Sequence, residues 1–262
     1  MSLWIGGPPG AGKTTVARLL ARRHGLRWYG ADAHTWKHRD RAIAAGHRAA
    51  IRWEALPREE RWSAPEEELL AMSLHHERGA MIAEDVRALP PSPPTVVEGT
   101  PVTPRFAGPR ALWLLPTPEV QRRRLAERGL EPGPLALYRH LVRVIEAEVE
   151  EYGGAVLRVD GERGVAETLA EVEGFFAGEL SGVRTAEGRR GLLRYANGVV
   201  AEQYRGFLGR AWAPRAGLVA RFACECASPV CEEDVPLDPL AYPPPLPLLA
   251  HGHAAPPNAS AV

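Results

Sequence analysis

Lysine is almost absent from this sequence. Lysine and arginine together number 32 of 262 residues, yet lysine occurs only at Lys13 and Lys37. Because arginine supplies nearly every other cation, a lysine at position 13 points to a chemical requirement there. Asparagine is as scarce, at Asn197 and Asn258 alone. The chain therefore lacks the Asn-Lys-x-Asp motif that recognises guanine, which argues against a GTPase.

Net charge and long apolar runs are also missing. Acidic and basic residues both number 32, so no overall field favours nucleic acid or an anionic membrane. The local exception is a basic group at Arg189, Arg190 and Arg194. No apolar run approaches the roughly 20 residues that span a bilayer, and the first residues read as a strand rather than as a secretory signal. We expect a cytoplasmic protein without a membrane partner, of undetermined oligomeric state.

Cysteine is limited to three residues crowded together, Cys224, Cys226 and Cys231. In a cytosolic protein this arrangement favours a metal site or free thiols over a disulfide framework. Three thiolates with one imidazole, from His251 or His253, would form a closed tetrahedral zinc site of structural type. The spacing C-x-C-x₄-C is less specific than paired C-x-x-C units, so three buried thiols are the alternative.

The most informative stretch is SLWIGGPPGAGKTTV, residues 2–16, which reads as a strand, a glycine-rich turn and the start of a helix. Residues 7–14 fit the phosphate-loop pattern G-x-x-x-x-G-K-[ST]. Its glycines let backbone N–H groups wrap around nucleotide phosphates, at the positive end of the following helix. Lys13 would reach the β- and γ-phosphates, and the Thr14 hydroxyl would ligate Mg²⁺. The predicted nucleotide-binding residues are Gly7, Pro8, Pro9, Gly10, Ala11, Gly12, Lys13, Thr14 and Thr15.

Short apolar strands alternate with helical patterns through the first two thirds of the chain. The predicted strands cover residues 3–5, 26–32, 95–100, 110–116 and 155–161. The predicted helices cover residues 14–24, 66–90, 118–129, 135–153 and 165–180, whereas residues 33–65 look irregular. This alternation predicts an α/β fold of the P-loop NTPase type, with a five-stranded parallel sheet covered on both faces. Ligands then gather at the carboxyl ends of the strands.

The composition changes near residue 182. Residues 184–212 read as a helix weakened by internal glycines, and residues 222–253 are rich in proline and cysteine. We predict a nucleotide-binding domain over residues 1–180, a small helical and cysteine-rich module over 182–253, and a disordered tail over 254–262.

The order of these features resembles the nucleoside-monophosphate-kinase-like group of P-loop small-molecule kinases, which includes gluconate kinase, shikimate kinase, chloramphenicol phosphotransferase and zeta toxin. More closely, the whole chain is similar to a family of uncharacterised actinobacterial ATP-binding proteins. In that family, stretches like PREERW, VVEGT, RALWLLPTPEVQRRR and a C-terminal F-x-C-E-C…C…G-H tail recur. The resemblance implies ATP and Mg²⁺ as cofactors but no known substrate. It also matches His253 best as the fourth zinc ligand.

Two carboxylates follow predicted strands and match positions in these kinases. Asp32 matches the acidic residue that accepts the proton of the substrate hydroxyl or orients it; the alternative is that Asp32 caps the next helix. Glu98, after the neighbouring strand, could hold a metal-bound water or a substrate hydroxyl. Its alternative is a structural bond to the phosphate-loop backbone.

Arg122, Arg123 and Arg124 fall where such kinases carry a lid. Arginines there neutralise charge on the transferred phosphoryl group. Consecutive helical residues point in different directions, so at most two can face ATP. We assign this catalytic role to Arg123, although the pattern itself does not choose among the three. The alternative is a solvated basic face.

The segment over residues 33–65 is the expected acceptor site, because aromatic faces pack against sugar rings and arginines bind anionic groups. It holds Trp36, Trp53 and Trp62, and Trp36 is our candidate for contact with the substrate. The alternative is a lid that buries its tryptophans in a small core of its own.

Together these features predict an ATP- and Mg²⁺-dependent phosphotransferase that acts on a hydroxyl of a small molecule such as a sugar, nucleoside or antibiotic. Two alternatives stay open. One is a nucleotide-binding regulatory protein whose C-terminal module docks a protein or nucleic acid, and the other is a kinase that modifies a macromolecule.

Overall fold

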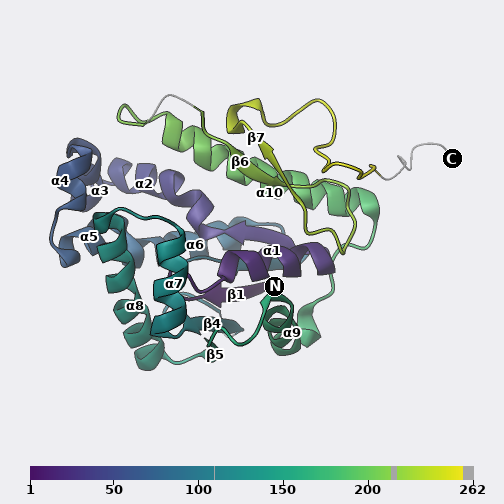
Figure 1. The fold of residues 1–262 in the computed structure, drawn as a ribbon, viewed down its shortest axis with the longest axis horizontal. Helices are drawn as coiled ribbons and strands as arrows, with labels where there is room; N and C mark the ends of the chain where they lie inside the picture. The colour runs from purple at the N-terminus through teal and green to yellow at the C-terminus, as the bar shows by residue number, and fades with distance from the viewer. Residues whose placement is uncertain (109, 214–216, 256–262) are drawn as a thin grey trace.

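Five parallel strands form the main sheet of the computed structural model, which describes residues 1–108, 110–213 and 217–255. Their order across the sheet is β2-β3-β1-β4-β5 (Figure 1). The strands are β1 (Ser2–Gly6), β2 (Arg27–Gly30), β3 (Thr95–Glu98), β4 (Ala111–Pro116) and β5 (Ala155–Val159). In the central strand, Ile5 pairs with Glu98 of β3 and Leu112 of β4. This is the P-loop NTPase fold that the sequence predicts, with the phosphate loop directly after the central strand.

Helices cover both faces of the sheet, because the strands carry apolar side chains on both sides. Leu3 and Ile5 face one layer, and Trp4 and Trp113 face the other. The first layer consists of α1 (Lys13–His24), α9 (Val165–Phe175) and α10 (Ala186–Leu208). The second consists of α3 (Arg48–Ala55), α5 (Glu66–Ser73), α6 (His75–Ala88) and α8 (Pro132–Tyr152). Because the strands are parallel, their carboxyl ends lie at one edge of the sheet, where the phosphate loop begins.

The segment over residues 33–65 is helical, and the expectation that it would be irregular is wrong. It contains the end of the turn η1 (Ala31–His34), then α2 (Thr35–Ala44), α3 and α4 (Arg58–Trp62). These helices have only 5 to 10 residues, so an apolar period hardly repeats before each one ends. The preceding strand stops at Gly30, which places Asp32 in η1 rather than at a strand end.

The long helix expected over residues 66–90 is two helices, α5 and α6. They meet at Leu74, which takes a left-handed conformation with φ 60° and ψ 31°. That conformation is unfavourable for leucine, but its side chain is buried beside Ala42 and Ala50 of α2 and α3. Burial of an apolar side chain by another part of the chain compensates for the local strain, and no local pattern reveals it.

The predicted helices after β4 and β5 are confirmed. Pro118 opens α7 (Pro118–Glu127), and the Thr117 side chain accepts the N–H of Val120 as an N-cap. The short turn η2 (Ala177–Glu179) then follows α9. The internal glycines of α10 do not interrupt its 23 residues.

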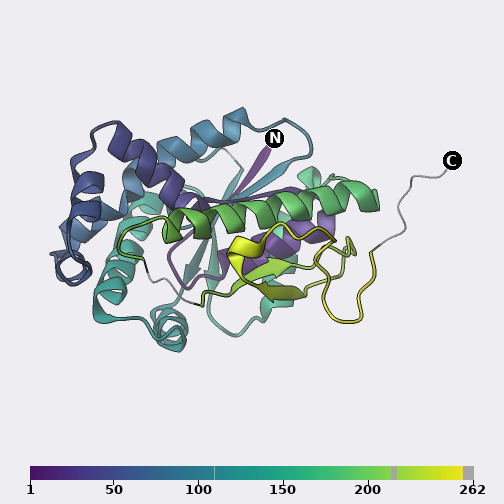
Figure 2. The ribbon, with the colours of Figure 1, turned by 90° about the horizontal axis from the view of Figure 1, so that it is seen from above.

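The C-terminal part packs against α1 rather than standing apart. Figure 2 shows α10 crossing the molecule with the antiparallel pair β6 (Ala220–Ala223) and β7 (Asp234–Leu237) beside it. The turn η3 (Pro239–Ala241) follows. Asp234 accepts hydrogen bonds from Arg18 at 3.1 Å and Arg22 at 2.6 Å, both on α1. The helix that follows the phosphate loop is therefore tied directly to the C-terminal hairpin.

Two expectations about the ends and the surface of the chain can be placed here. Most of the predicted tail, residues 256–262, lies outside the described residues. Within the described ranges, every helix is too short or too polar to cross a membrane.

Candidate active site

The phosphate loop takes a backbone path that requires glycine. Gly7, Gly10 and Gly12 have φ values of 134°, 87° and 90°. A Cβ at Gly7 would lie 2.2 Å from the carbonyl oxygen of Leu114 in β4. The loop is thus packed directly against the neighbouring strand, and its shape is set by the sheet as well as by the motif.

Lys13 lies across this loop and is only 5 % exposed. Its Nζ donates to the Pro8 carbonyl at 2.9 Å and to the Thr100 hydroxyl at 3.4 Å. Burial lowers the pKa of Lys13, while the carboxylates of Asp32 and Glu98 act in the opposite direction. The loop and the two carboxylates therefore hold a cation at the start of α1.

Thr14 and Glu98 come together from α1 and the end of β3. The Thr14 hydroxyl donates to Oε2 of Glu98 at 3.0 Å, and Glu98 is 1 % exposed. Burial, with the nearby charge of Asp32, raises the pKa of Glu98 to about 7. A hydroxyl beside a carboxyl supplies the hard oxygen ligands that Mg²⁺ prefers. Glu98 therefore bonds to the Thr14 side chain, whereas the structural alternative predicts a bond to the backbone of the phosphate loop.

Asp32 lies between the phosphate loop and the loop after β3. Its Oδ2 accepts the N–H of Thr100 at 3.2 Å, and the side chain is exposed. The N-cap residue of α2 is His34, which makes no side-chain cap bond. The carboxylate of Asp32 is thus held from the β3 side and stays open to a ligand.

One cavity of about 520 Å³ joins Lys13, Thr14 and Asp32 to the tryptophan-rich segment. We call its lining by Gly10, Gly12, Lys13, Thr14 and Asp32 the phosphate side. We call its lining by Trp36, Arg39, Trp53 and Trp62 the insert side. A nucleotide phosphate and a second small molecule could therefore lie in one shared cavity.

The tryptophans of the insert side fit both interpretations, as part of an acceptor site and as a small core of their own. Trp53 and Trp62 meet edge to face at 4.9 Å, and the Arg39 guanidinium lies 4.7 Å from the Trp53 ring centre. Trp36 packs against Phe207 of α10 and against Trp212, with ring centres 5.7 and 5.6 Å apart. The tryptophans form a small aromatic core, and the same rings line the cavity.

The arginines of α7 point in three directions. Arg122 pairs with Glu119 at 3.0 Å on the surface, and Arg123 lies beside Gly161 after β5. Arg124 instead donates to the Gly10 carbonyl at 2.9 Å, and Arg128 lines the cavity. Arg123, the position assigned from the sequence, is therefore not among the residues lining the cavity.

Several residues that line the cavity carry no sequence signal of a site. Arg39 and Arg78 are buried on α2 and α6, and Arg78 donates to the Ala31 carbonyl at 2.5 Å. His75 of α6 and Tyr138 of α8 also line the cavity. Arg128 alone had a usable signal, because it lies four residues after Arg124 and so shares its helical direction.

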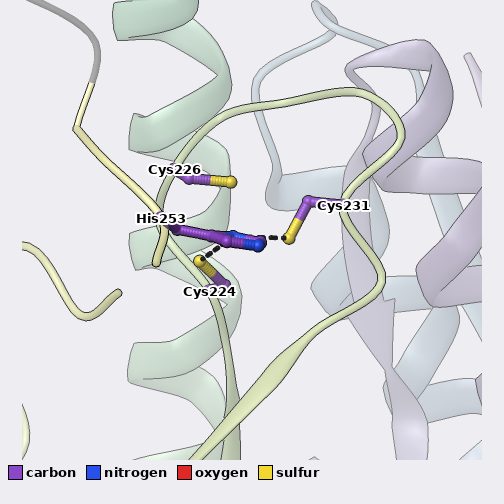
Figure 3. A group of neighbouring side chains, drawn as sticks. All are labelled: Cys224, Cys226, Cys231 and His253. Atoms are coloured by element: carbon purple, nitrogen blue, oxygen red, sulfur yellow. Dashed lines mark hydrogen bonds between the residues drawn. The ribbon is translucent and has the colours of Figure 1, made fainter. Parts of the chain in front are cut away.

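The three cysteines and one histidine form a second cluster, in the C-terminal part (Figure 3). The Sγ atoms of Cys224, Cys226 and Cys231 and a ring nitrogen of His253 all lie within 4.8 Å of one another. His253 Nδ1 is 3.3 Å from Cys224 Sγ and 3.6 Å from Cys231 Sγ. Tetrahedral zinc bonded at about 2.3 Å to sulfur and about 2.0 Å to nitrogen needs ligand atoms roughly 3.5–3.8 Å apart. The donor set and its spacing fit a closed structural metal site.

Neither a protein-family model nor a curated protein matches the chain. The solved structures that resemble it include the following three. Shikimate kinase from Acinetobacter baumannii, in complex with shikimate, is 18 % identical over 69 % of this chain and 95 % of its own, with a TM-score of 0.43. TT1252 from Thermus thermophilus is 25 % identical over 70 % of this chain and 98 % of its own, with a TM-score of 0.47. An unliganded sugar kinase from a Janibacter species is 19 % identical over 70 % of this chain and 98 % of its own, with a TM-score of 0.38. The strand order and the phosphate loop, rather than these remote likenesses, establish the P-loop NTPase fold.

Proposed function

We propose that this protein is a kinase that transfers the γ-phosphoryl group of ATP to a hydroxyl of a small molecule. The observation that carries the proposal is the shared cavity, in which the phosphate loop and Asp32 adjoin a pocket of tryptophan and arginine side chains. A cavity of about 520 Å³ lies in the range of ligand sites in proteins, roughly 300–1,000 Å³. A cytoplasmic location and the finer kinship with the kinase group named above belong to the same proposal.

Each residue of the phosphate side, together with Glu98, would have its own role in the reaction. Lys13 and the loop N–H groups would hold the β- and γ-phosphates, and Thr14 with Glu98 would hold Mg²⁺. When bound, the metal ion neutralises charge on the phosphates. Asp32 would orient the acceptor hydroxyl and take its proton. A new bond then forms between the acceptor oxygen and phosphorus, and the bond to ADP breaks.

In this proposal, Arg124 and Arg128 take the role that the sequence assigns to Arg123. Arg124 contacts the Gly10 carbonyl of the phosphate loop, and Arg128 lines the cavity. Arginines in these positions can neutralise charge that develops on the transferred group. Arg124→Ala and Arg128→Ala should therefore lower kcat more than Arg123→Ala does.

The C-terminal module over residues 182–253 is proposed to carry structural zinc. Cys224, Cys226, Cys231 and His253 supply a complete tetrahedral donor set, which leaves no position for catalysis. Such a site suits a proline-rich segment with a small core of its own.

ADP release from Mg·ATP, measured against a panel of hydroxylated small molecules, tests the kinase proposal. Asp32→Asn should lose turnover while its affinity for Mg·ATP is retained, because the loop that binds the phosphates is untouched. Lys13→Ala serves as the blank. ATP binding without stimulation by any compound would refute a small-molecule kinase and favour a nucleotide-binding regulatory protein or a macromolecular substrate.

A further inference from the structure

Arg39 is a buried arginine whose hydrogen-bonding capacity is mostly unused. The residue is 3 % exposed, and its Nη2 donates to the Met72 carbonyl at 2.8 Å. Within the described residues, its Nε and Nη1 atoms are buried without any partner. The indole Nε1 of Trp53, under the same guanidinium, is likewise buried and unpartnered there. Native proteins seldom leave buried N–H groups unsatisfied, so three at one place indicate a missing acceptor.

The charge of Arg39 is also unbalanced within the part of the chain that the structure describes. The carboxylate that acts on it most strongly is that of Glu54. Both oxygens of Glu54 are already engaged, by Arg210 at 3.2 Å and by the Trp212 indole at 2.9 Å. Burial lowers the pKa of Arg39 to about 10, which still leaves it charged at neutral pH. A buried charge without a counter-ion is costly, so a negative group is expected beside it.

The cavity as a whole has the same imbalance. The lysine and arginine residues that line it are Lys13, Arg39, Arg78 and Arg128, and the carboxylate that lines it is Asp32. The phosphates of a nucleotide would engage Lys13 and Arg128. Arg39 comes from α2 in the insert, between Trp36 and Trp53, and does not belong to the phosphate loop.

We propose that the phosphoryl acceptor is an anion, whose carboxylate or phosphate group binds Arg39 and the Trp53 indole while its hydroxyl lies at Asp32. The unsatisfied groups on this side are donors, so the ligand must present acceptor oxygens there. Trp36, Trp53 and Trp62 suit a flat or ring-shaped body attached to the charged group. This inference rests on the proposed kinase function, whose substrate class it narrows.

Equilibrium binding in the presence of Mg·ADP tests this inference with two matched sets of alcohols. One set is glucose, glucuronate and glucose 6-phosphate. The other is benzyl alcohol, 4-(hydroxymethyl)benzoate and 4-(hydroxymethyl)phenyl phosphate. In at least one set, an anionic member should bind the wild-type protein roughly 10- to 100-fold more tightly than the neutral member, as expected for hydrogen bonds to a buried charge. The carboxylate and phosphate arms identify which oxyanion the site takes.

Variants assign the preference to Arg39. Arg39→Gln should abolish it and Arg39→Lys should retain part of it. Arg41→Gln is the matched control, because Arg41 lies on the same helix but pairs with Glu84 and Asp85. Mg·ATP affinity should stay unchanged in each variant, which also reports that the protein is folded. If Arg39→Gln does not fold, Arg39→Lys must still lower the preference, since an ammonium group cannot reproduce the forked hydrogen bonds of a guanidinium.

Two results would overturn the inference: equal binding of neutral and anionic members, or a preference that survives Arg39→Gln. The kinase proposal fails separately. Arg39-dependent binding of an anion without ADP release would refute the kinase and leave the anion site intact. ADP release on neutral alcohols, with an unchanged KM in Arg39→Gln, would do the reverse.

Discussion

The two sides of the cavity differ in how far the protein satisfies its own polar groups. On the phosphate side, Lys13 bonds to a loop carbonyl, Thr14 bonds to Glu98, and Asp32 accepts a backbone N–H. On the insert side, Arg39 and Trp53 keep buried N–H groups without partners in the described chain. The phosphate side is therefore organised before any ligand arrives, whereas the insert side is completed only by a ligand.

The difference follows from how each side is built. The phosphate side comes mainly from one short stretch between β1 and α1, held against β3 and β4. The insert side gathers residues from α2, α3 and α4, and residues near the end of α10 brace it through Phe207 and Trp212. A site made from one motif can serve any nucleotide reaction, but a site assembled from distant segments can be shaped to one acceptor.

The largest effect should come from the phosphate side. Lys13→Ala should lower kcat by on the order of 100- to 1,000-fold, the usual loss when a group that stabilises transferred charge is removed. Lys37→Ala is a matched control, since it removes the other lysine of the chain, which is 61 % exposed. Initial rates of ADP release check the prediction. Equal losses in both variants would mean that overall charge, rather than the position of Lys13, controls the rate.

Loss of the metal should give the next largest effect, on stability. His253→Ala should lose bound zinc and lower Tm by on the order of 5–10 °C, because structural zinc contributes directly to folding. His251→Ala should keep both its zinc and its Tm, since His251 is exposed and stands outside the ligand group. Metal analysis and thermal unfolding of the purified proteins check this.

The zinc content of the wild-type protein tests whether metal holds the C-terminal part together. The cluster of cysteines and His253 is linked to this region because the Cys224 N–H donates to the carbonyl of Glu233 at 3.0 Å, next to Asp234, which holds Arg18 and Arg22 of α1. A zinc content near zero in the wild-type protein, prepared without chelators, would end the proposal that this module is held by metal.

A smaller effect is expected from loosening the insert side alone. Glu54 binds both Arg210 and Trp212, so Glu54→Gln should weaken the support of Trp36 by the C-terminal residues. The KM of the acceptor should rise roughly 5- to 20-fold while the KM of Mg·ATP stays the same. Glu59→Gln, an exposed substitution on α4, is the control. A parallel rise in both KM values would show that the two sides are not independent.

The sequence predicts the phosphate side well because its signal is local. Each residue of the loop acts through backbone shape or a fixed spacing, so the motif, the strand before it and the helix after it suffice. The same holds for Cys224, Cys226 and Cys231, which lie within eight residues. Of two candidate histidines, the structure brings His253 to the cluster, as the resemblance implied.

The sequence predicts the three tryptophans of the insert side, but the buried arginines near them escape prediction because their signal is not local. Arg39 and Arg78 are two among many arginines, and only tertiary packing buries them beside the cavity. Leu74 ends a helix that the periodicity would continue, because burial of its side chain stabilises the left-handed backbone conformation at this position. Arg123 lies on the same helix as Arg124, but its direction depends on how α7 packs against the residues after β5, which spacing alone does not give.

The smallest effect concerns η1, which joins the sheet to the insert. His34 stacks on Tyr29 at 4.2 Å, and burial lowers the pKa of His34 to about 4. An unfolded histidine titrates near 6.5. Between pH 6.5 and 4 the unfolded chain therefore binds a proton that the folded protein does not, so stability falls as the pH falls through this window. After allowance for partial exposure, the loss should be about 1 kcal/mol.

His34→Gln should flatten the dependence of Tm on pH between 6.5 and 4 and leave its shape above pH 7 unchanged. If the slope persists in this variant, the acid sensitivity arises elsewhere, and η1 does not couple protonation to the join between sheet and insert.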